Sequence, residues 1–242
     1  MHSPMEQFEI KRLLNFHIGS LDASYTNSAL WMTIAVILAF LLFVVGTQKR
    51  ALVPGRVQAM AELGYEFVAN MVRDNVGDAG KKYFPFVLTL FVFILFCNVL
   101  GLVPYSFTPT SHIIVTFAMA AVVFVGVTVI GFARHGLHFL SLFVPKGVPF
   151  VLLLLLVPIE IISYFVRPFS LSIRLFANML AGHTMLKVFG GFVVMMGILG
   201  GWAPLAFIVI LTGLELLIAF LQAYVFAILT CLYLNDAIHL HH

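Results

Sequence analysis

A polar stripe within a long apolar stretch carries side chains that could move protons. Its members recur at intervals of three and four residues: Glu160, Ser163, Arg167, Ser170, Arg174 and Asn178. On a helix this spacing places them on one continuous face, with His183 one residue off its extension. Carboxyl and imidazole groups can take up and release protons, whereas a guanidinium keeps its charge in proteins. The stripe therefore combines sites that could hold a proton with a fixed positive charge.

A second polar stripe follows in the next long apolar segment. Its members fall roughly on one helical face, and they are Thr212, Glu215, Gln222 and Thr230. Two such stripes on neighbouring helices predict a shared hydrated surface. Ionisable groups inside a membrane cost at least about 2.5–3.5 kcal/mol each and usually mark ion or proton pathways. For the Ser and Thr side chains the alternative stays open that they only hold helices together by hydrogen bonds.

The composition indicates that lipid surrounds these helices. Hydrophobic residues make up 62% of the 242 residues and charged residues 10%, whereas about 25% of the residues in soluble domains are charged. A soluble fold of this size could not bury so much apolar surface. Cys97 and Cys231 both lie in apolar runs, which argues against a disulfide framework. We therefore expect an all-α integral membrane protein.

The apolar segments predict five membrane crossings. Residues 29–47, 84–104 and 112–133 have the length of ordinary spans across about 30 Å of hydrocarbon. Residues 56–76 alternate apolar and polar faces at the helical period, which predicts an amphipathic helix on the membrane surface. The remaining two segments, 149–189 and 202–234, would extend roughly 60 Å and 48 Å as single helices. We predict one long, steeply tilted helix for each rather than a pair of short spans, with the two forming a hairpin.

Basic residues in the loops predict the orientation. Segments 48–83 and 134–148 together contain eight Lys and Arg residues, and the opposite side has three. Because such residues accumulate in cytoplasmic loops, we expect the N-terminal segment 1–28 outside and the C-terminus in the cytoplasm. The chain, residues 1–242, then forms a single membrane domain.

Sequence position also predicts the depth of each ionisable group. Glu160 lies towards the inner side, Arg174 near the middle, and His183 and Glu215 in the outer half. A proton could enter by one half and leave by the other, while the fixed charge of Arg174 blocks a direct passage. Arg167 either extends to the membrane surface or pairs with Glu160, two helical turns away.

The sequence around these residues resembles subunit a of the F-type ATP synthase membrane sector. The most specific stretch is residues 170–183, SLSIRLFANMLAGH. The likeness continues in residues 98–105 (NVLGLVPY), 109–112 (PTSH) and 221–226 (LQAYVF), and spans roughly residues 29–236. The resemblance implies a stationary, proton-conducting subunit whose long hairpin lies against a rotating ring of c subunits. It also implies b-type peripheral stalk subunits as partners and an indirect connection to the F1 sector.

The resemblance further implies roles for individual residues. Arg174 matches the essential arginine that faces the ring carboxylate and separates two offset half-channels. The matches to the outer half-channel are Asn178, His183, Glu215 and Gln222, and those to the inner half-channel are Glu160 and Ser163. His112 stands where bacterial members of the family often carry an acid, and it is included among the proton-translocating residues.

Other function classes compete with this interpretation. One is a self-contained proton channel or secondary transporter, and another is a structural subunit whose buried charges only fix assembly. The chain has no internal repeat of the kind found in inverted-repeat transporters. It also has no nucleotide loop of the G-x-x-x-x-G-K-[ST] type, so we do not expect an enzyme by itself. We also expect no cofactor, no metal and no bound nucleic acid. The absence of a secretory signal or transit segment favours a bacterial plasma membrane.

Overall fold

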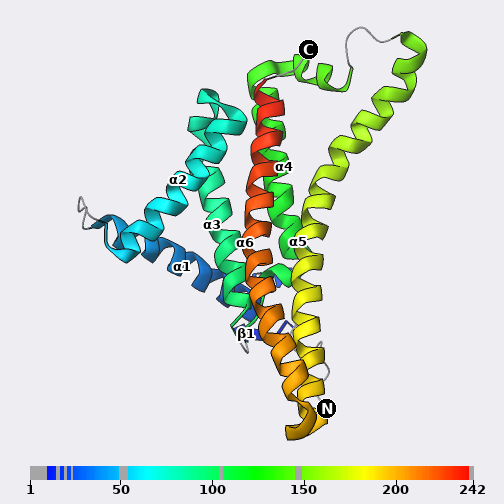
Figure 1. The fold of residues 1–242 in the computed structure, drawn as a ribbon. Coiled ribbons are helices and arrows are strands. Elements are labelled where there is room, and N and C mark those ends of the chain that lie inside the picture. Colours follow the sequence, from blue (N-terminus) through cyan, green and yellow to red (C-terminus); the bar gives the residue numbers. More distant parts are fainter. Residues whose placement is uncertain are drawn as a thin grey trace.

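Six α-helices account for most of the described residues. The computed structural model describes residues 10–14, 17–18, 21–22, 24–48, 54–103, 106–144 and 149–239. The helices are α1 (Asn27–Gln48), α2 (Arg56–Val76), α3 (Phe84–Gly101), α4 (Ile113–His135), α5 (Phe150–Gly200) and α6 (Trp202–Ile238), arranged as in Figure 1. Short 3-10 helices lie between them: η2 (Asp78–Tyr83), η3 (Pro109–Ser111) and η4 (Gly136–Phe143).

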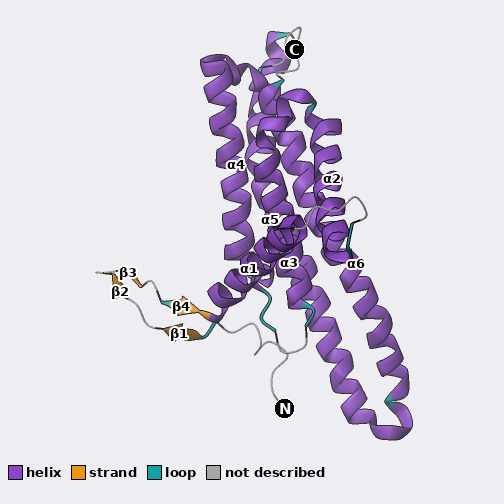
Figure 2. Ribbon diagram, turned by 90° about the vertical axis from the view of Figure 1, so that its left-hand side faces the viewer, coloured by secondary structure: helices purple, strands orange, loops and turns teal. Residues whose placement is uncertain are grey.

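Short strands precede the first helix and form two small antiparallel ribbons. They are β1 (Arg12–Leu14), β2 (His17–Ile18), β3 (Leu21–Asp22) and β4 (Tyr25–Thr26). Strand β1 pairs with β4 and strand β2 pairs with β3. Figure 2 shows both ribbons projecting from the helical bundle.

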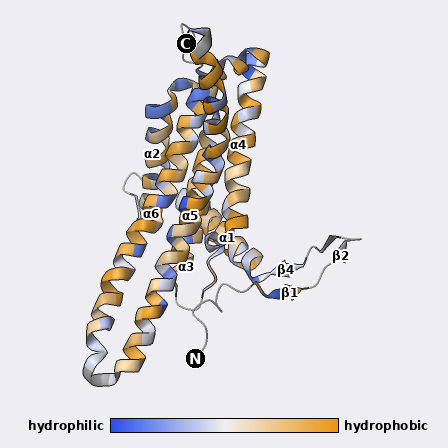
Figure 3. Ribbon diagram, turned by 90° about the vertical axis from the view of Figure 1, so that its right-hand side faces the viewer, coloured by the Kyte–Doolittle hydropathy of each residue, from blue (hydrophilic) through white to orange (hydrophobic). Residues whose placement is uncertain are grey.

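Five helical segments are long and apolar enough to cross a membrane. They are Asn27–Gln48, Asp78–Gly101, Ile113–Phe143, Leu152–Gly197 and Trp202–Ile238. Hydrophobic residues predominate along these helices, as the colouring of Figure 3 shows, and many large apolar side chains are exposed. On α4, for example, Val122, Val125 and Val129 are all more than half exposed. Soluble proteins rarely expose such continuous apolar surface. The predicted all-α membrane fold with five spans is therefore confirmed.

Helix α2, which precedes the second span, is amphipathic. Its buried residues recur at helical spacing and are Ala61, Val68, Met71, Val72 and Val76. The helix contacts α1, α3 and α6. On the opposite face Glu62, Glu66 and Arg73 are exposed. The helix ends at Gly77, whose positive φ of 72° favours glycine. The apolar face of α2 therefore serves, at least in part, to pack against other helices.

The two longest helices, α5 and α6, form an antiparallel hairpin that reaches beyond the other helices (Figure 1). Helix α5 has 51 residues and α6 has 37. At 1.5 Å per residue these correspond to about 77 Å and 56 Å. Helix α5 continues past the predicted end at residue 189 because residues 190–200 are apolar and contain no proline. The helical backbone breaks at Gly197, where φ is 60°.

Polar contacts attach α5 to α4 at two levels. The Thr128 hydroxyl lies 2.7 Å from the Tyr164 hydroxyl, and the Thr116 hydroxyl lies 3.1 Å from that of Ser172. Thr116 and Ser172 are both buried, and the ring of Phe124 packs against that of Tyr164. These contacts fix the position of α5 along α4 and thereby the height of the polar residues that α5 carries.

Candidate functional site

The buried face of α6 carries three of the four polar side chains of the second predicted stripe, Glu215, Gln222 and Thr230. Glu215 and Gln222 lie seven residues apart and are each 8% exposed. Ala219, Ala223 and Ala227 lie along the buried side of the same helix and are fully buried. Small side chains of this kind let membrane helices approach closely. The carboxyl and amide groups are therefore held inside the helix packing.

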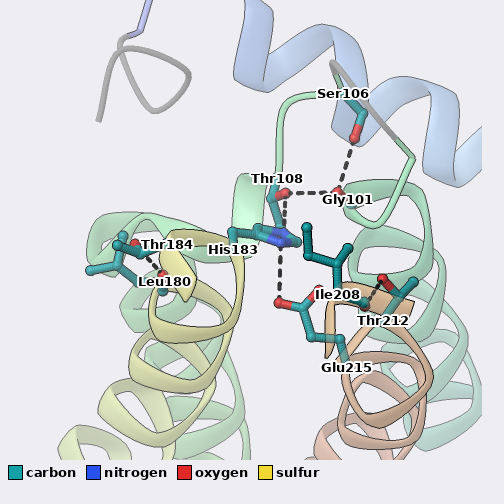
Figure 4. A network of polar contacts seen from close by, with 9 residues as sticks. All are labelled: Gly101, Ser106, Thr108, Leu180, His183, Thr184, Ile208, Thr212 and Glu215. Atoms are coloured by element: carbon teal, nitrogen blue, oxygen red, sulfur yellow. Dashed lines mark hydrogen bonds and ion pairs between the residues drawn. The ribbon is translucent and has the colours of Figure 1, made fainter. Parts of the chain in front are cut away.

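His183 of α5 and Glu215 of α6 form the central contact of the site (Figure 4). The imidazole Nδ1 lies 3.6 Å from Glu215 Oε1, which agrees with the common depth predicted for these two residues. The other ring nitrogen, Nε2, lies 2.8 Å from the hydroxyl of Thr108, in the loop between α3 and η3. Among the described residues, Glu215 Oε2 is buried and has no hydrogen-bond partner. An acid beside an imidazole can hold one proton between the two groups, and each makes the charge of the other tolerable.

A cavity of about 160 Å³ opens beside this pair. Asn178, Gly182 and Glu215 contribute to its lining. Gly182 matters because a Cβ atom at this position would overlap Glu215 Oε1. Most of the lining is apolar, and Asn178 and Glu215 contribute its polar side chains. The predicted outer residue Asn178 thus shares a cavity with Glu215.

A second buried network joins α3, η3 and α6. Asn98 is fully buried, and its amide donates a hydrogen bond of 3.2 Å to the carbonyl of Ala219. Its Oδ1 accepts a hydrogen bond of 2.8 Å from the Thr110 hydroxyl. Asn98 and Thr110 lie within the motifs at residues 98–105 and 109–112, but these contacts were not predicted. The sequence contained one signal for these contacts, the amide of Asn98 inside the apolar segment 84–104, because a buried polar group requires a hydrogen-bond partner.

Arg174 lies away from this pair. Its side chain is exposed, and within the described part of the chain its guanidinium makes no hydrogen bond or ion pair. The neighbouring side chains of Phe169 and Ile173 are about half exposed. Asn178, one turn further along α5, is exposed as well. A fixed charge in this apolar setting needs an opposite charge or water from outside the described residues.

The predicted inner residues lie near the beginning of α5. Glu160 is half-buried and Ser163 is exposed. On the same helix, about five and a half turns separate Ser163 from His183. The structure therefore brings together the outer residues His183, Glu215 and Asn178, and it keeps the inner residues apart from them.

Arg167 pairs with Asp236, and the suggested pairing with Glu160 is wrong. The guanidinium Nη1 lies 3.0 Å from Asp236 Oδ2. The same guanidinium lies over the ring of Tyr164 at 5.4 Å and over that of Tyr233 at 4.9 Å. Along one helix, seven residues span about 10.5 Å, which explains the poor reach towards Glu160. Asp236 was missed because the last helix was predicted to end at residue 234, whereas α6 continues to Ile238.

His112 lies in the same connection as Thr108 but does not join the central pair. Its ring stacks on Phe107, with the centroids 5.0 Å apart and an interplanar angle of 16°. Its Nε2 is buried and has no hydrogen-bond partner among the described residues. Burial lowers the pKa of His112 below its usual value. Ile114, two residues further, is 71% exposed.

Within the described ranges, no group of three or more His, Cys, Asp or Glu residues could hold a metal ion. The polar groups that remain are an acid, an imidazole, amides and hydroxyls, all of which form hydrogen bonds with water or with one another.

Comparisons with known proteins give a consistent result over nearly the whole chain. The family described as ATP synthase A chain matches residues 29–235. The chain is 59% identical over 241 residues to ATP synthase subunit a of Pelagibacter ubique, with 99% of each chain covered. It is 58% identical over 241 residues to ATP synthase subunit a of Rhodospirillum rubrum, with both chains covered completely. For the protein of the same name in Paramagnetospirillum magneticum, the identity is 57% over 247 residues, again with complete coverage.

Proposed function

Because the chain belongs to the family of ATP synthase A chains, we propose that it forms two separate proton routes to and from a rotor carboxylate, with Arg174 between them. The chain is a multi-pass membrane subunit of an ATP synthase and takes part in proton transport. By its resemblance to the family, the rotor is the ring of c subunits. Stalk subunits of the b type and the F1 sector complete the set of expected partners.

The exposed guanidinium of Arg174 is the observation that carries this proposal. It lies on an open apolar face of α5 and makes no hydrogen bond or ion pair within the described residues. A rotor carboxylate that arrives neutral from the lipid would lose its proton beside this charge, because a nearby cation favours the ionised form of an acid. Arginine cannot itself carry the proton across. The same exposure argues against a self-contained channel, in which the charge would need a partner in its own chain.

The outer route uses the His183–Glu215 pair and the cavity next to it. Protons would reach the pair from outside and pass through the cavity lined by Asn178 towards the rotor face. Gln222, two turns from Glu215 on the same side of α6, adds a further polar group along this route.

The inner route begins near Glu160 and Ser163, at the opposite end of α5. We place this end on the cytoplasmic side of a bacterial plasma membrane and the N-terminus outside, as the distribution of basic residues favours. The Arg167–Asp236 pair then lies on the inner side and holds α5 against α6 beside this route.

Replacing Arg174 tests the proposal directly. We expect Arg174→Ala to abolish ATP-driven proton pumping in inverted vesicles while the complex still assembles. Arg174→Lys should fail too, because an ammonium has different reach and loses its proton when desolvated. Arg73→Ala, which removes an exposed charge from α2, is the matched control and should pump normally. Normal pumping by an assembled Arg174→Ala complex would refute the mechanism.

The outer pair is tested by exchanging its two groups. Glu215→Gln should reduce proton flux, because an amide keeps the shape of the side chain but cannot titrate. The double exchange His183→Glu with Glu215→His should retain more flux than either single exchange, since an acid and an imidazole would still be adjacent. Unimpaired pumping by Glu215→Gln across a range of pH would show that Glu215 only holds the two helices together.

A further inference from the structure

We propose that Thr108 is a positioning residue for His183. The hydroxyl of Thr108 stays hydrogen-bonded to Nε2 of His183 in each protonation state of the ring. The imidazole Nδ1 would then face Glu215 throughout proton uptake and release. This inference rests on the proposed exchange of protons between His183 and Glu215, and it adds a third residue from a different part of the fold.

The hydroxyl of Thr108 has two polar neighbours. It lies 2.8 Å from His183 Nε2 and 3.4 Å from the carbonyl oxygen of Gly101, at the end of α3 (Figure 4). Thr108 is 3% exposed, so its hydroxyl is sheltered from bulk solvent. A Cβ atom at Gly101 would lie 2.5 Å from Thr108 Oγ1, so glycine at this position permits the close approach.

Two neighbours of different chemistry allow the hydroxyl to act in both directions. A hydroxyl has one hydrogen to donate and two lone pairs that accept, whereas a backbone carbonyl can only accept. When Nε2 carries no hydrogen, Thr108 donates to Nε2. When Nε2 carries a hydrogen, Thr108 accepts from it and turns its own hydrogen towards the Gly101 carbonyl. Both neutral tautomers of His183, and the doubly protonated ring, therefore keep a partner at Nε2.

In this arrangement Nδ1 faces Glu215 and can exchange a proton with it. Suppose that the carboxyl group of Glu215 is protonated and His183 carries its hydrogen on Nε2. Transfer breaks the O–H bond of the carboxyl group and forms an N–H bond at Nδ1, which gives a carboxylate and an imidazolium. The new Nδ1–H faces the carboxylate, and Nε2–H remains bonded to Thr108. The reverse transfer restores both neutral groups, and the Thr108 hydroxyl gains or loses no proton in either direction.

Other threonines near the pair lack this role and supply a control. The hydroxyl of Thr184, next to His183 in the chain, donates to the carbonyl of Leu180 in its own helix. Thr212 does the same with the carbonyl of Ile208 on α6. Replacing Thr184 by valine removes a hydroxyl adjacent to His183 and leaves the partner of the ring in place.

The test compares proton pumping by Thr108→Val, Thr108→Ser and Thr184→Val in inverted vesicles that contain the assembled complex. Valine keeps the shape of threonine but removes the hydroxyl that bonds to Nε2. We expect flux to fall about tenfold, the factor for one lost hydrogen bond to a charged group. Serine should restore most of the flux because it keeps the hydroxyl. Thr184→Val should pump as the unmodified complex does. If Thr108→Val does not assemble, Thr108→Ala with the same serine rescue takes its place.

A pH profile distinguishes positioning from a merely structural effect. Valine removes the acceptor that the imidazolium needs at Nε2, so the pH of half-maximal flux should fall by about one unit, the equivalent of a tenfold change. The ionisable groups to consider around the ring are Glu215 on α6, Lys187, one turn further along α5, and His112 in the same connection as Thr108. Within the described residues 106–108, Ser106 and Thr108 contribute hydroxyl groups. None of the three variants alters those charges.

The outcomes separate this inference from the proposed function. Suppose that Thr108→Val leaves the proton flux and its pH profile unchanged, whereas Glu215→Gln blocks proton flux. This result would overturn the role of Thr108 and leave the proposed proton route intact. Equal impairment by serine and valine would also overturn it, because shape and not the hydroxyl would then matter. Normal pumping by Glu215→Gln would instead remove the proton exchange on which the inference rests.

Discussion

Gly182→Ala should uncouple the central pair without unfolding the protein. The added methyl group would overlap Glu215 Oε1 and lie 3.0 Å from Cδ and 3.2 Å from Cγ of the same side chain. Nonbonded carbon and oxygen atoms in van der Waals contact are farther apart than these distances, so the carboxyl group must move by about 1 Å. The His183–Glu215 contact, already 3.6 Å, would then lie beyond direct hydrogen-bond reach.

Function and stability should respond to this change very differently. A displacement of about 1 Å at a reacting group can cost about a hundredfold in rate, so we expect proton flux to fall by one to two powers of ten. The atoms that must yield belong to the far end of a flexible side chain. The free energy of unfolding should therefore change by only about 1 kcal/mol, the lower end for overpacking.

ATP-driven acidification of inverted vesicles measures the flux, and co-purification of the complex measures assembly. Gly213→Ala is the matched control, because it adds the same methyl group to α6 at a position with no atom within 4 Å. That variant should pump normally. Normal pumping by an assembled Gly182→Ala complex would show that the carboxylate does not need its place beside Gly182 and His183.

Three further predictions concern other parts of the chain. Asp236→Asn should lower the free energy of unfolding by about 1–3 kcal/mol, between the values for exposed and buried ion pairs. If Asp236→Asn costs as much stability in the Arg167→Gln variant as in the unmodified protein, the two residues do not form a stabilising pair. A cysteine in place of Pro168 should resist membrane-impermeant thiol reagents from both sides, whereas strong labelling from one side would indicate a loop at that surface. Because burial lowers the pKa of His112, the unfolded chain binds a proton at this residue more readily than the folded protein does. The free energy of unfolding should therefore fall as the pH drops below about 6.5. In melting curves recorded at several pH values, His112→Phe should weaken this dependence of stability on pH.

Helical periodicity predicted much of the fold and part of the site. Long apolar segments identify the spans because lipid requires a fixed length of apolar helix. The spacing of Glu160, Arg174 and Asn178 assigns them to one helix, and chain position places His183 and Glu215 at a similar depth. The 3.6 Å contact between His183 and Glu215 agrees with that expectation. Their roles in proton transfer stay predictions until the variants are measured.

The contacts that were missed arise where periodicity gives no information. Thr108 lies in a connection between helices, so no repeating pattern relates it to His183, 75 residues later. Gly182 contributes by lacking a side chain, which no property of the polar stripe reveals. Asp236 lies beyond the predicted helix end, and its partner Arg167 is 69 residues away in the sequence. Such long-range pairs are determined by how the helices pack, which the chain order alone does not specify.

The polar contacts along α5 also have a mechanical consequence. Tyr164, Arg167, Ser172 and His183 each bond to a neighbouring segment, so these attachments extend over about 28 Å of the helix. Arg174 lies between the outermost attachments. If the rotor pushes sideways against this residue, α5 is loaded as a beam that is supported on both sides of the load, which bends far less than a beam fixed at one end. The helix can then hold the guanidinium at a constant height while a torque passes through it to the rest of the subunit.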